Sequence, residues 1–511
     1  MAEAGPSDKD TVGWGGWAGY LAMCLGMFMA ILDIQIVASS LPDIQAALHV
    51  PMDRLSWIQT AYLIAEIIAI PLTGWLTRLL SLRGLFLLSV STFTLASIGC
   101  AFSPGFSTLL VFRVIQGFCG GAMIPAVFTG VFALFPERLH VRATAIAGAF
   151  AMLAPTLGPI LGGYITETYS WPWLFLINLG PGILAGGIAA RLLRTPPADR
   201  AAMGWLDWPS LGLLAISLAL LQLGLKEAPE RGWRDPVSLM LLAIAFGAGI
   251  MGVRRCFALA RPLIDLRPLK EPGFASGCVF SFVLGAGLYG SVYLLPLFLG
   301  YVRQHTAFEI GRIMLVSGVA QLLTAPLAAI LEKRVDPRIL AGIGYGLFTA
   351  GLLANGFMTF ESDYDDLFWP QIVRGVGIMF CILPTTSVAL EGRSGGALAD
   401  ASGLFNLMRN LGGAVWIAVA DTILLTRPEA HVTRLVERLQ AGDPEAARLV
   451  GLSLDRFQNV PLGPVDEATR QFVQPLVERA AAVASFNDAW LLTAICCGLS
   501  LLILPWLKKR P

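Results

Sequence analysis

Residues 154–163 read Ala154-Pro155-Thr156-Leu157-Gly158-Pro159-Ile160-Leu161-Gly162-Gly163. They belong to an apolar stretch that is long enough to cross a membrane as a helix. Steps of three and four residues from Gly148 reach Ala151, Pro155, Gly158 and Gly162, which form one stripe about 20 Å long at about 1.5 Å per residue. Small residues let another helix approach closely, and prolines bend a helix. The stripe therefore predicts a kinked membrane helix packed at a helix–helix interface.

Composition predicts an all-α polytopic membrane protein. Of the 511 residues, 56% are hydrophobic and only 14% are charged, whereas about a quarter of the residues in a soluble domain are charged. The formal net charge of +1 gives no electrostatic reason to expect nucleic acid as a partner. Membrane lipid is the expected surrounding, and the cytoplasmic (inner) membrane is the expected location.

Apolar runs of about 20 residues predict fourteen membrane spans. They lie near 15–41, 55–76, 84–102, 107–131, 143–165, 171–192, 209–225, 236–253, 273–300, 308–331, 338–357, 367–390, 399–425 and 487–507. With the N-terminus in the cytoplasm, the cytoplasmic connections hold about sixteen Lys or Arg and the opposite short connections about five. The positive-inside rule therefore predicts that both termini are cytoplasmic.

The two halves of the chain contain a weak repeat. Arg113-Val114-Ile115-Gln116-Gly117 is echoed by Gln371-Ile372-Val373-Arg374-Gly375 with an offset of 258 residues, and Leu41-Pro42 by Leu295-Pro296 with an offset of 254. The seventh and eighth spans have no echo. Parallel six-helix repeats are typical of transporters that bind substrate between the halves. The predicted parts are a cytoplasmic tail (1–13), a six-helix bundle (14–193), a linker with two extra spans (194–258) and a second six-helix bundle (259–511).

The long connection 426–486 carries mixed charge together with helical periodicity in Val432, Leu435, Val436 and Leu439. We expect a helical cap outside the cytoplasm, with a disordered loop as the alternative. The four histidines and eight cysteines show no ligand spacing. No metal or cofactor is expected. No Gly-Lys phosphate loop is found, so the expected source of energy for transport is an ion gradient or the substrate itself.

Several motifs together resemble the fourteen-span drug:proton antiporters of the major facilitator superfamily, the EmrB/QacA type. They are Gly158 to Gly163, Arg113 to Gly117, Leu32-Asp33 with Leu41-Pro42, Trp171 to Asn178, and Pro262-Leu263-Ile264-Asp265-Leu266. The resemblance covers nearly the whole chain. It implies the major facilitator fold with twelve core helices, export of amphipathic compounds and exchange for protons, the proton being the coupling ion.

One loop departs from the pattern of that family. The loop between spans two and three usually reads Gly-x-Leu-x-Asp-Arg-x-Gly-Arg, whereas here it runs from Gly74 to Arg83 with Arg78 in place of the acid and Ser81 in place of the glycine. We therefore expect that the charge relay between this loop and its neighbouring helix is altered.

Charges inside apolar spans are the candidates for coupling, because each costs roughly 2.5 to 3.5 kcal/mol at the centre of a membrane helix. Asp33 is the first candidate for binding the proton, with the role of a structural partner near the helix end as the alternative. Glu66 is the second, and proton coupling, recognition of cationic substrates and interhelical bonding are all open for it. Arg113 is expected to control the proton affinity of a carboxylate.

The small-residue stripe, with Pro155, Gly158, Pro159, Gly162 and Gly163, is expected to act as a conformational motif. We predict that span five packs against span ten, where Gly311, Gly318 and Ala325 recur every seven residues. Polar residues of several spans are expected to line the substrate cavity, with plain interhelical packing as the alternative for each: Gln116, Tyr289, Tyr293, Gln321, Asn406, Arg409 and Asn410.

The sequence favours a secondary active transporter over an enzyme. The leading hypothesis is proton-coupled export of small amphipathic drugs or toxic compounds by alternating access. The alternative is an importer or exchanger of a physiological metabolite on the same scaffold. An extracytoplasmic membrane-fusion adaptor is a candidate partner of the 426–486 connection.

Overall fold

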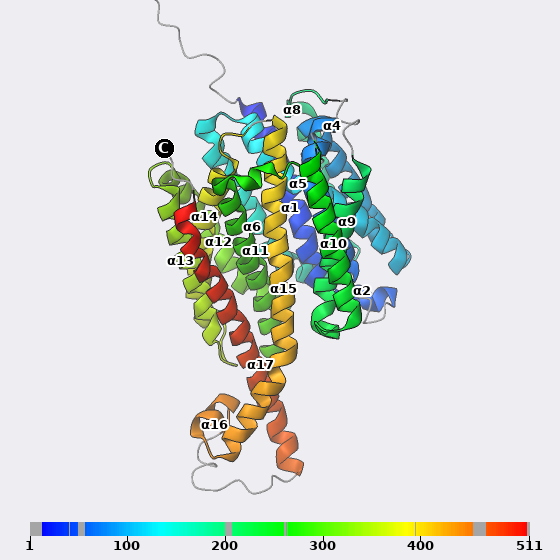
Figure 1. Cartoon of the computed structure of the whole chain (residues 1–511). Helices are drawn as coiled ribbons and strands as arrows, with labels where there is room; N and C mark the ends of the chain where they lie inside the picture. The colour runs from blue at the N-terminus through cyan, green and yellow to red at the C-terminus, as the bar shows by residue number, and fades with distance from the viewer. Residues whose placement is uncertain are drawn as a thin grey trace, which may run out of the picture.

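A computed structural model describes residues 13–39, 41–49, 57–199, 207–259, 262, 264–393, 395–452 and 467–507. Long helices run side by side in one bundle, and a small helical cap stands at one end (Figure 1). The first half comprises α1 (Trp14–Ser39), α2 (Leu41–Leu48), α4 (Trp57–Ala101), α5 (Phe106–Leu134), α6 (Glu137–Thr168), α7 (Trp173–Leu176) and α8 (Leu179–Leu192).

The linking pair and the second half follow in chain order. The linking pair is α9 (Trp208–Arg231) and α10 (Pro236–Ala258). The second half comprises α11 (Pro272–Leu297), α12 (Ala307–Glu332), α13 (Pro337–Ala354), α14 (Tyr364–Leu390), α15 (Gly395–Gln440), α16 (Pro444–Val450) and α17 (Glu467–Leu499). Short helical turns lie at η2 (Arg267–Lys270), η3 (Phe298–Val302), η4 (Asn355–Phe357) and η6 (Ser500–Trp506).

Polar side chains define where several helices begin. Asp207, Asp235 and Asp336 each accept a hydrogen bond from a backbone N–H in the first turn of α9, α10 and α13. Thr306 and Glu309 form a capping box at the start of α12. These side chains satisfy backbone donors that a helix leaves unpaired at its N-terminus.

Within the described residues, twelve helices are long and apolar enough to cross a membrane, and bent α6 makes a thirteenth. The 45-residue helix α4 covers two of the spans predicted from sequence. Its helical geometry is interrupted at Ser81, which has φ 66° and ψ 160°. Left-handed φ is costly for any residue with a Cβ, and Ser81 stands where the loop motif usually has glycine.

Helix α6 bends as the prolines predict. The segments Glu137–Pro155 and Ile160–Thr168 are inclined by 44°. Gly162 and Gly163 are buried beyond the bend, whereas the side chain of Pro159 is outside the described set. The kink follows from proline, which cannot donate a backbone hydrogen bond and whose ring crowds the preceding turn.

The predicted pairing of span five with span ten is confirmed, because α6 packs against α12. Gly311 faces Ile160, and Ala325 shares an apolar cluster with Val141 and Ala145. The prediction that the whole stripe faces α12 is wrong. A Cβ on Gly158 would collide with Gln35 of α1, and the bend turns the two ends of the stripe toward different helices.

The opposite end of the stripe faces α14. A Cβ on Gly148 would lie 3.7 Å from Cε of Met379 and 3.9 Å from Cγ2 of Ile382. These are ordinary van der Waals separations, so Gly148 has room for a methyl group where Gly158 has none.

Replacing Gly158 with Val is therefore expected to lower the free energy of unfolding by about 1–3 kcal/mol, the usual cost of overpacking a well-packed interior. The added atoms must push α1 away from α6, and export should fall with it. Thermal unfolding of the purified protein and a resistance assay measure both effects. Gly148→Ala is the matched control, and equal losses in the two variants would contradict the packing argument.

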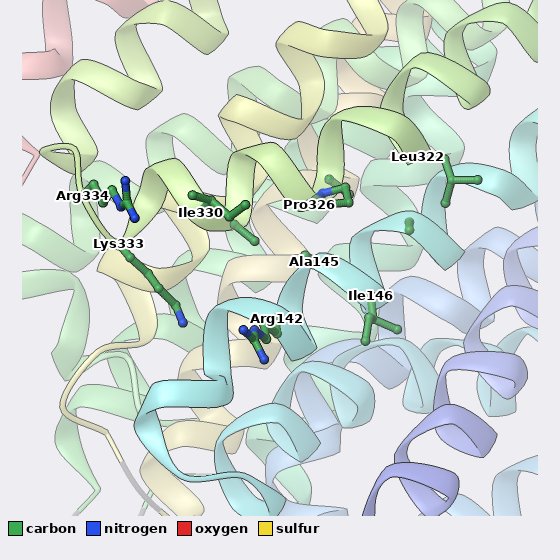
Figure 2. A pocket seen from close by; sticks show the side chains of 11 residues that line it. Arg142, Ala145, Ile146, Leu322, Pro326, Ile330, Lys333 and Arg334 are labelled. Carbon is green, nitrogen blue, oxygen red and sulfur yellow. The ribbon is translucent and has the colours of Figure 1, made fainter.

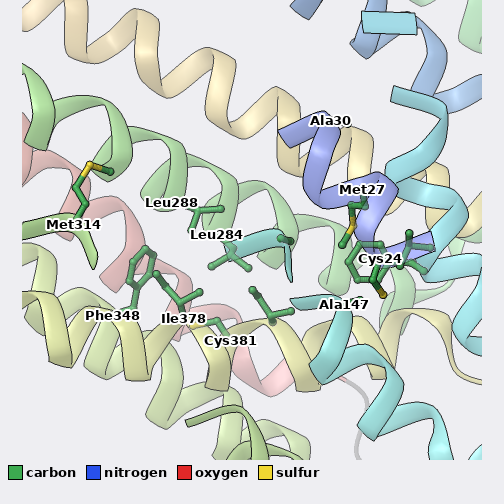
Figure 3. Close-up of a cluster of buried hydrophobic side chains, with 14 of the residues drawn as sticks. Cys24, Met27, Ala30, Ala147, Leu284, Leu288, Met314, Phe348, Ile378 and Cys381 are labelled. Atoms are coloured by element: carbon green, nitrogen blue, oxygen red, sulfur yellow. The ribbon is translucent and has the colours of Figure 1, made fainter. Parts of the chain in front are cut away.

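A buried apolar cluster continues from the first half into the second. Figure 3 labels Cys24, Met27 and Ala30 of α1 together with residues of α6 and α11 to α14. Packing at this density transmits a displacement of one helix to its neighbours.

The 426–486 connection is helical on both sides of 453–466, which lie outside the described residues. The end of α15, helix α16 and the start of α17 enclose a small core that includes Leu435, Leu439, Val450 and Val477. The expected helical structure is confirmed for these residues. Helix α16 lies at the opposite end of the bundle from the C-terminal end of α17 (Figure 1).

Candidate functional site

Asp33 of α1 and Arg113 of α5 form an ion pair in the interior of the first half. Both side chains are fully buried, with 0% exposure. Arg113 also donates from Nε to the carbonyl oxygen of Ile58 at 3.1 Å. Its guanidinium lies over the ring of Tyr62, 4.4 Å from the ring centroid. The expected Asp33 site thus has Arg113 as its direct partner.

Three uncharged polar side chains complete the surroundings of this pair. Asn178 donates from Nδ2 to Oδ1 of Asp33 at 2.8 Å, and Gln116 donates from Nε2 to the same oxygen at 3.5 Å. Gln116 also accepts from Arg113 at 3.1 Å and donates to Ser97 at 2.8 Å. One buried network therefore joins α1, α4, α5 and the α7–α8 junction.

This network brings together residues that the sequence did not group. Gln116, expected at the substrate cavity, is fully buried within the Asp33 network. Asn178 belongs to the stretch that resembles the family motif, and the sequence does not predict its contact with Asp33. Its signal in the sequence is an amide within an otherwise apolar segment, which needs a buried partner.

The arrangement can link protonation to helix packing. A buried guanidinium is tolerated when a carboxylate balances its charge, and removing one charge of such a pair is strongly destabilising. A proton on Asp33 would leave Arg113 uncompensated between α1, α4 and α5. Through this pair, a change in the protonation of Asp33 would alter the contacts among these helices.

Glu66 lies elsewhere on α4, with a buried side chain. It has no hydrogen-bond or ion-pair partner within the parts of the chain that the structure describes. Gly121 of α5 packs directly against the backbone of Glu66, since a Cβ there would lie 2.9 Å from its Cα. The charge of Arg113 acts on this carboxylate without forming an ion pair with it, and burial makes the charged form of Glu66 costly.

The predicted cavity residues of the second half lie on α11, α12 and α15. Tyr289 donates to Asn410 at 3.0 Å, and Arg409 lies over the rings of Phe405 and Phe128 at 5.4 and 5.7 Å. Because Phe128 belongs to α5, Arg409 is at the interface between the halves.

The other predicted cavity residues bond mainly within the second half. Gln321 and Asn406 donate to the carbonyl oxygens of Ser317 and Ser402, each one turn earlier in its own helix. Tyr293 donates to Asp421 of α15, a carboxylate that the sequence analysis did not select.

The altered loop forms an ion pair between the two halves. Arg78 of α4 binds Asp400 of α15 through two parallel hydrogen bonds of 2.9 and 3.0 Å. Gly74 faces the same carboxylate, so a side chain there would collide with it. Ser402 and Gly403 contact Pro125 and Ile70 nearby. The charges at this loop therefore differ from the family pattern. The basic residue, Arg78, is on the loop, and its acidic partner, Asp400, is on the opposite half.

An open pocket of about 620 Å³ lies between α6 and α12. Its lining is mostly apolar, with Lys333 and Arg334 at one end and Leu322 at the other (Figure 2). None of the predicted cavity residues lines it.

Comparisons with known proteins place the chain in a family. The family model described as Major Facilitator Superfamily matches residues 23–417. The chain is 40% identical to the colistin resistance protein EmrB of Acinetobacter baumannii over 483 residues, which is 94% of each protein. It is 28% identical to the multidrug export protein EmrB of Escherichia coli K12, covering 96% of this chain and 95% of that protein.

Further matches agree with these. The fatty acid resistance protein FarB of Neisseria gonorrhoeae is 28% identical over 96% of both chains. The crystal structure of the human organic anion transporter MFSD10 has the same fold, with a TM-score of 0.57, 16% identity and coverage of 94% of this chain and 99% of that one. The chain is thus a multi-pass membrane transporter, not an enzyme, and it belongs to the EmrB-type drug efflux family of the major facilitator superfamily.

Proposed function

We propose that the protein exports amphipathic compounds across the cytoplasmic membrane in exchange for protons. The observation that carries this proposal is the buried network of Asp33 and Arg113, which holds a titratable carboxylate among three helices of one half. In the proposed cycle, a proton from outside neutralises Asp33, Arg113 changes partners, and the first half moves against the second.

The proposed topology has fourteen spans with both termini in the cytoplasm. Helix α4 then counts as two spans that meet at Ser81, and α7 with α8 forms one span. In this topology the α9–α10 pair joins two six-helix bundles, with the boundaries predicted from the sequence (14–193, 194–258 and 259–511). The cap around α16 would lie outside the cytoplasm, where it is available to an adaptor of the membrane-fusion type.

Transport in everted membrane vesicles tests the proposal directly. Lactate-energised vesicles should accumulate an amphipathic dye, and a protonophore should collapse the accumulation. Uptake by right-side-out vesicles instead would favour an importer and overturn the export proposal. Vesicles that contain the Asp33→Asn variant provide the control for leakage through the protein.

Glu66 is proposed to contact cationic substrates at the interface between the halves. Glu66→Gln should change the free energy of unfolding little, because Glu66 forms no ion pair within the described residues and its interaction with the charge of Arg113 is shared with Asp33. Export of cationic dyes should fall roughly tenfold, equivalent to about 1.4 kcal/mol in binding, with little change for neutral dyes.

Thermal unfolding and dye efflux with matched cationic and neutral dyes separate the roles of Glu66. Equal loss for both dyes would assign Glu66 to coupling instead of recognition. A lower unfolding temperature would point to an interhelical bond.

A further inference from the structure

The second half contains a buried arginine without a carboxylate. Arg374 of α14 is only 2% exposed, and its Nε and Nη1 have no hydrogen-bond partner among the residues that the structure describes. Its one hydrogen bond is a long one, from Nη2 to Oγ of Ser317 at 3.4 Å. No acidic residue within the described ranges pairs with it. Arginine stays charged in proteins, so this buried cation requires a compensating anion.

Neighbouring side chains add more donors at the same level of the bundle. Gln371 lies one turn before Arg374 on α14 and is fully buried with both amide atoms unpartnered. Asn355 at the end of α13 is also fully buried and unpartnered.

Helix packing brings these donors to one level. Helix α13 is antiparallel to α14, with Gly351 against Arg374 and Gly344 against Phe380 and Cys381. This register places Asn355 level with Gln371, one turn from Arg374.

A fourth donor comes from α17. The indole Nε1 of Trp490 is buried without a partner. Trp490 directly precedes Leu491, against which Gly356 packs, so its backbone lies beside η4 and Asn355. Arg374, Gln371 and Asn355 thus supply a guanidinium and two amides at one level of the bundle, and the backbone of Trp490 lies beside Asn355.

Comparison with the first half of the repeat shows that this cluster lacks a carboxylate. With the offset of 258 residues, Gln371 and Arg374 correspond to Arg113 and Gln116, and Asn355 corresponds to Ser97. In the first half these groups surround the carboxylate of Asp33 on α1. Helix α11, the counterpart of α1, contains neither Asp nor Glu. The second half retains the donors of the site and lacks its acceptor.

We propose that the second half binds a small monovalent anion, such as chloride, through Arg374, Gln371, Asn355 and Trp490. The anion replaces the carboxylate that Asp33 supplies in the first half and balances the charge of Arg374. Water would satisfy the N–H groups but would leave the guanidinium charge uncompensated. The site is separate from the proposed proton site and does not depend on the transported compound.

Thermal unfolding of the purified full-length protein in sodium chloride or sodium gluconate at equal ionic strength tests the proposal. Chloride should raise the unfolding temperature saturably, by roughly 2–5 °C at saturation, and bromide should substitute for it. Equilibrium binding of radioactive chloride should give one saturable class of site with the same midpoint.

Single substitutions test whether the chloride response of the unfolding temperature comes from this site. Variants of Gln371 and Asn355 keep the proposal testable even where Arg374→Met fails to fold. Gln371→Leu and Asn355→Leu should weaken the chloride response severalfold. Asn355→Asp should abolish it by supplying an internal carboxylate, with unfolding in gluconate shifted to the temperature of the chloride-bound parent. Arg409→Met is the matched control, because Arg409 is also buried with two unpartnered nitrogens but lies over the rings of Phe128 and Phe405.

Equal unfolding temperatures in chloride and gluconate would overturn the proposal. That result would mean that the amide oxygens of Gln371 and Asn355 turn to accept from Arg374. A chloride response that persists in the Gln371 and Asn355 variants, or that disappears in Arg409→Met, would also overturn it.

Discussion

Replacing Asp33 with Asn is expected to abolish proton-coupled export. The amide keeps the size of the side chain and its hydrogen bonds to Asn178 and Gln116 but cannot carry the charge that balances Arg113. Because one partner of a buried ion pair is lost, the free energy of unfolding should fall by about 3–5 kcal/mol. Dye-driven proton flux in proteoliposomes and thermal unfolding measure the two effects.

The double variant Asp33→Asn with Arg113→Gln separates coupling from stability. Neutralising both partners removes the uncompensated charge, so most of the lost stability should return. Export should remain absent, because no titratable group is left at the site. Proton-coupled export by the double variant would remove Asp33 from the mechanism. A stable single variant that transports normally would reduce the pair to a packing contact.

The helical architecture follows from the sequence because it depends on local composition. Apolar runs predicted helices long enough to cross a membrane, Pro155 predicted the bend in α6, and the recurrence of Gly311, Gly318 and Ala325 predicted its contact with α12. The partner of Gly158 could not be predicted in the same way. A 44° bend turns the two ends of one helix face toward different neighbours. The spacing of residues in the sequence does not predict the size or direction of that bend.

The charged residues of the site could be predicted from the sequence, because their positions inside apolar spans require them to be buried. Asp33 and Arg113 were selected because intramembrane charges are costly, and they are paired. The positions of Asn178 and Gln116 depend on how four segments meet, and uncharged amides give a weaker signal. Asp400 was missed for a related reason, since it lies 322 residues from Arg78 and nothing in the local sequence links the two.

The Arg78–Asp400 pair joins the two halves at the altered loop, and reversing either charge should impair transport. Asp400 is 5% exposed and Arg78 22% exposed, so solvent screens the pair only in part. Two parallel hydrogen bonds also fix the geometry of Arg78 on the carboxylate. Arg78→Asp places two carboxylates together, and Asp400→Arg places two guanidinium groups together. Each change should separate α4 from α15 and favour the conformation that is open at this end.

The double exchange Arg78→Asp with Asp400→Arg tests whether the pair itself, and not either side chain alone, holds the halves together. If it does, the double variant should regain much of the lost export, with a coupling energy of about 1–3 kcal/mol from the double-mutant cycle. Accessibility of a cysteine introduced between α4 and α15 should rise in each single variant and fall again in the double variant. Arg83→Asp is the control, because Arg83 bonds to Ala190 in its own half, and Asp400→Arg should not rescue it. Rescue of Arg83→Asp, or additive losses in the Arg78 and Asp400 pair, would show that net charge on this surface controls transport and that no specific bond between the halves is needed.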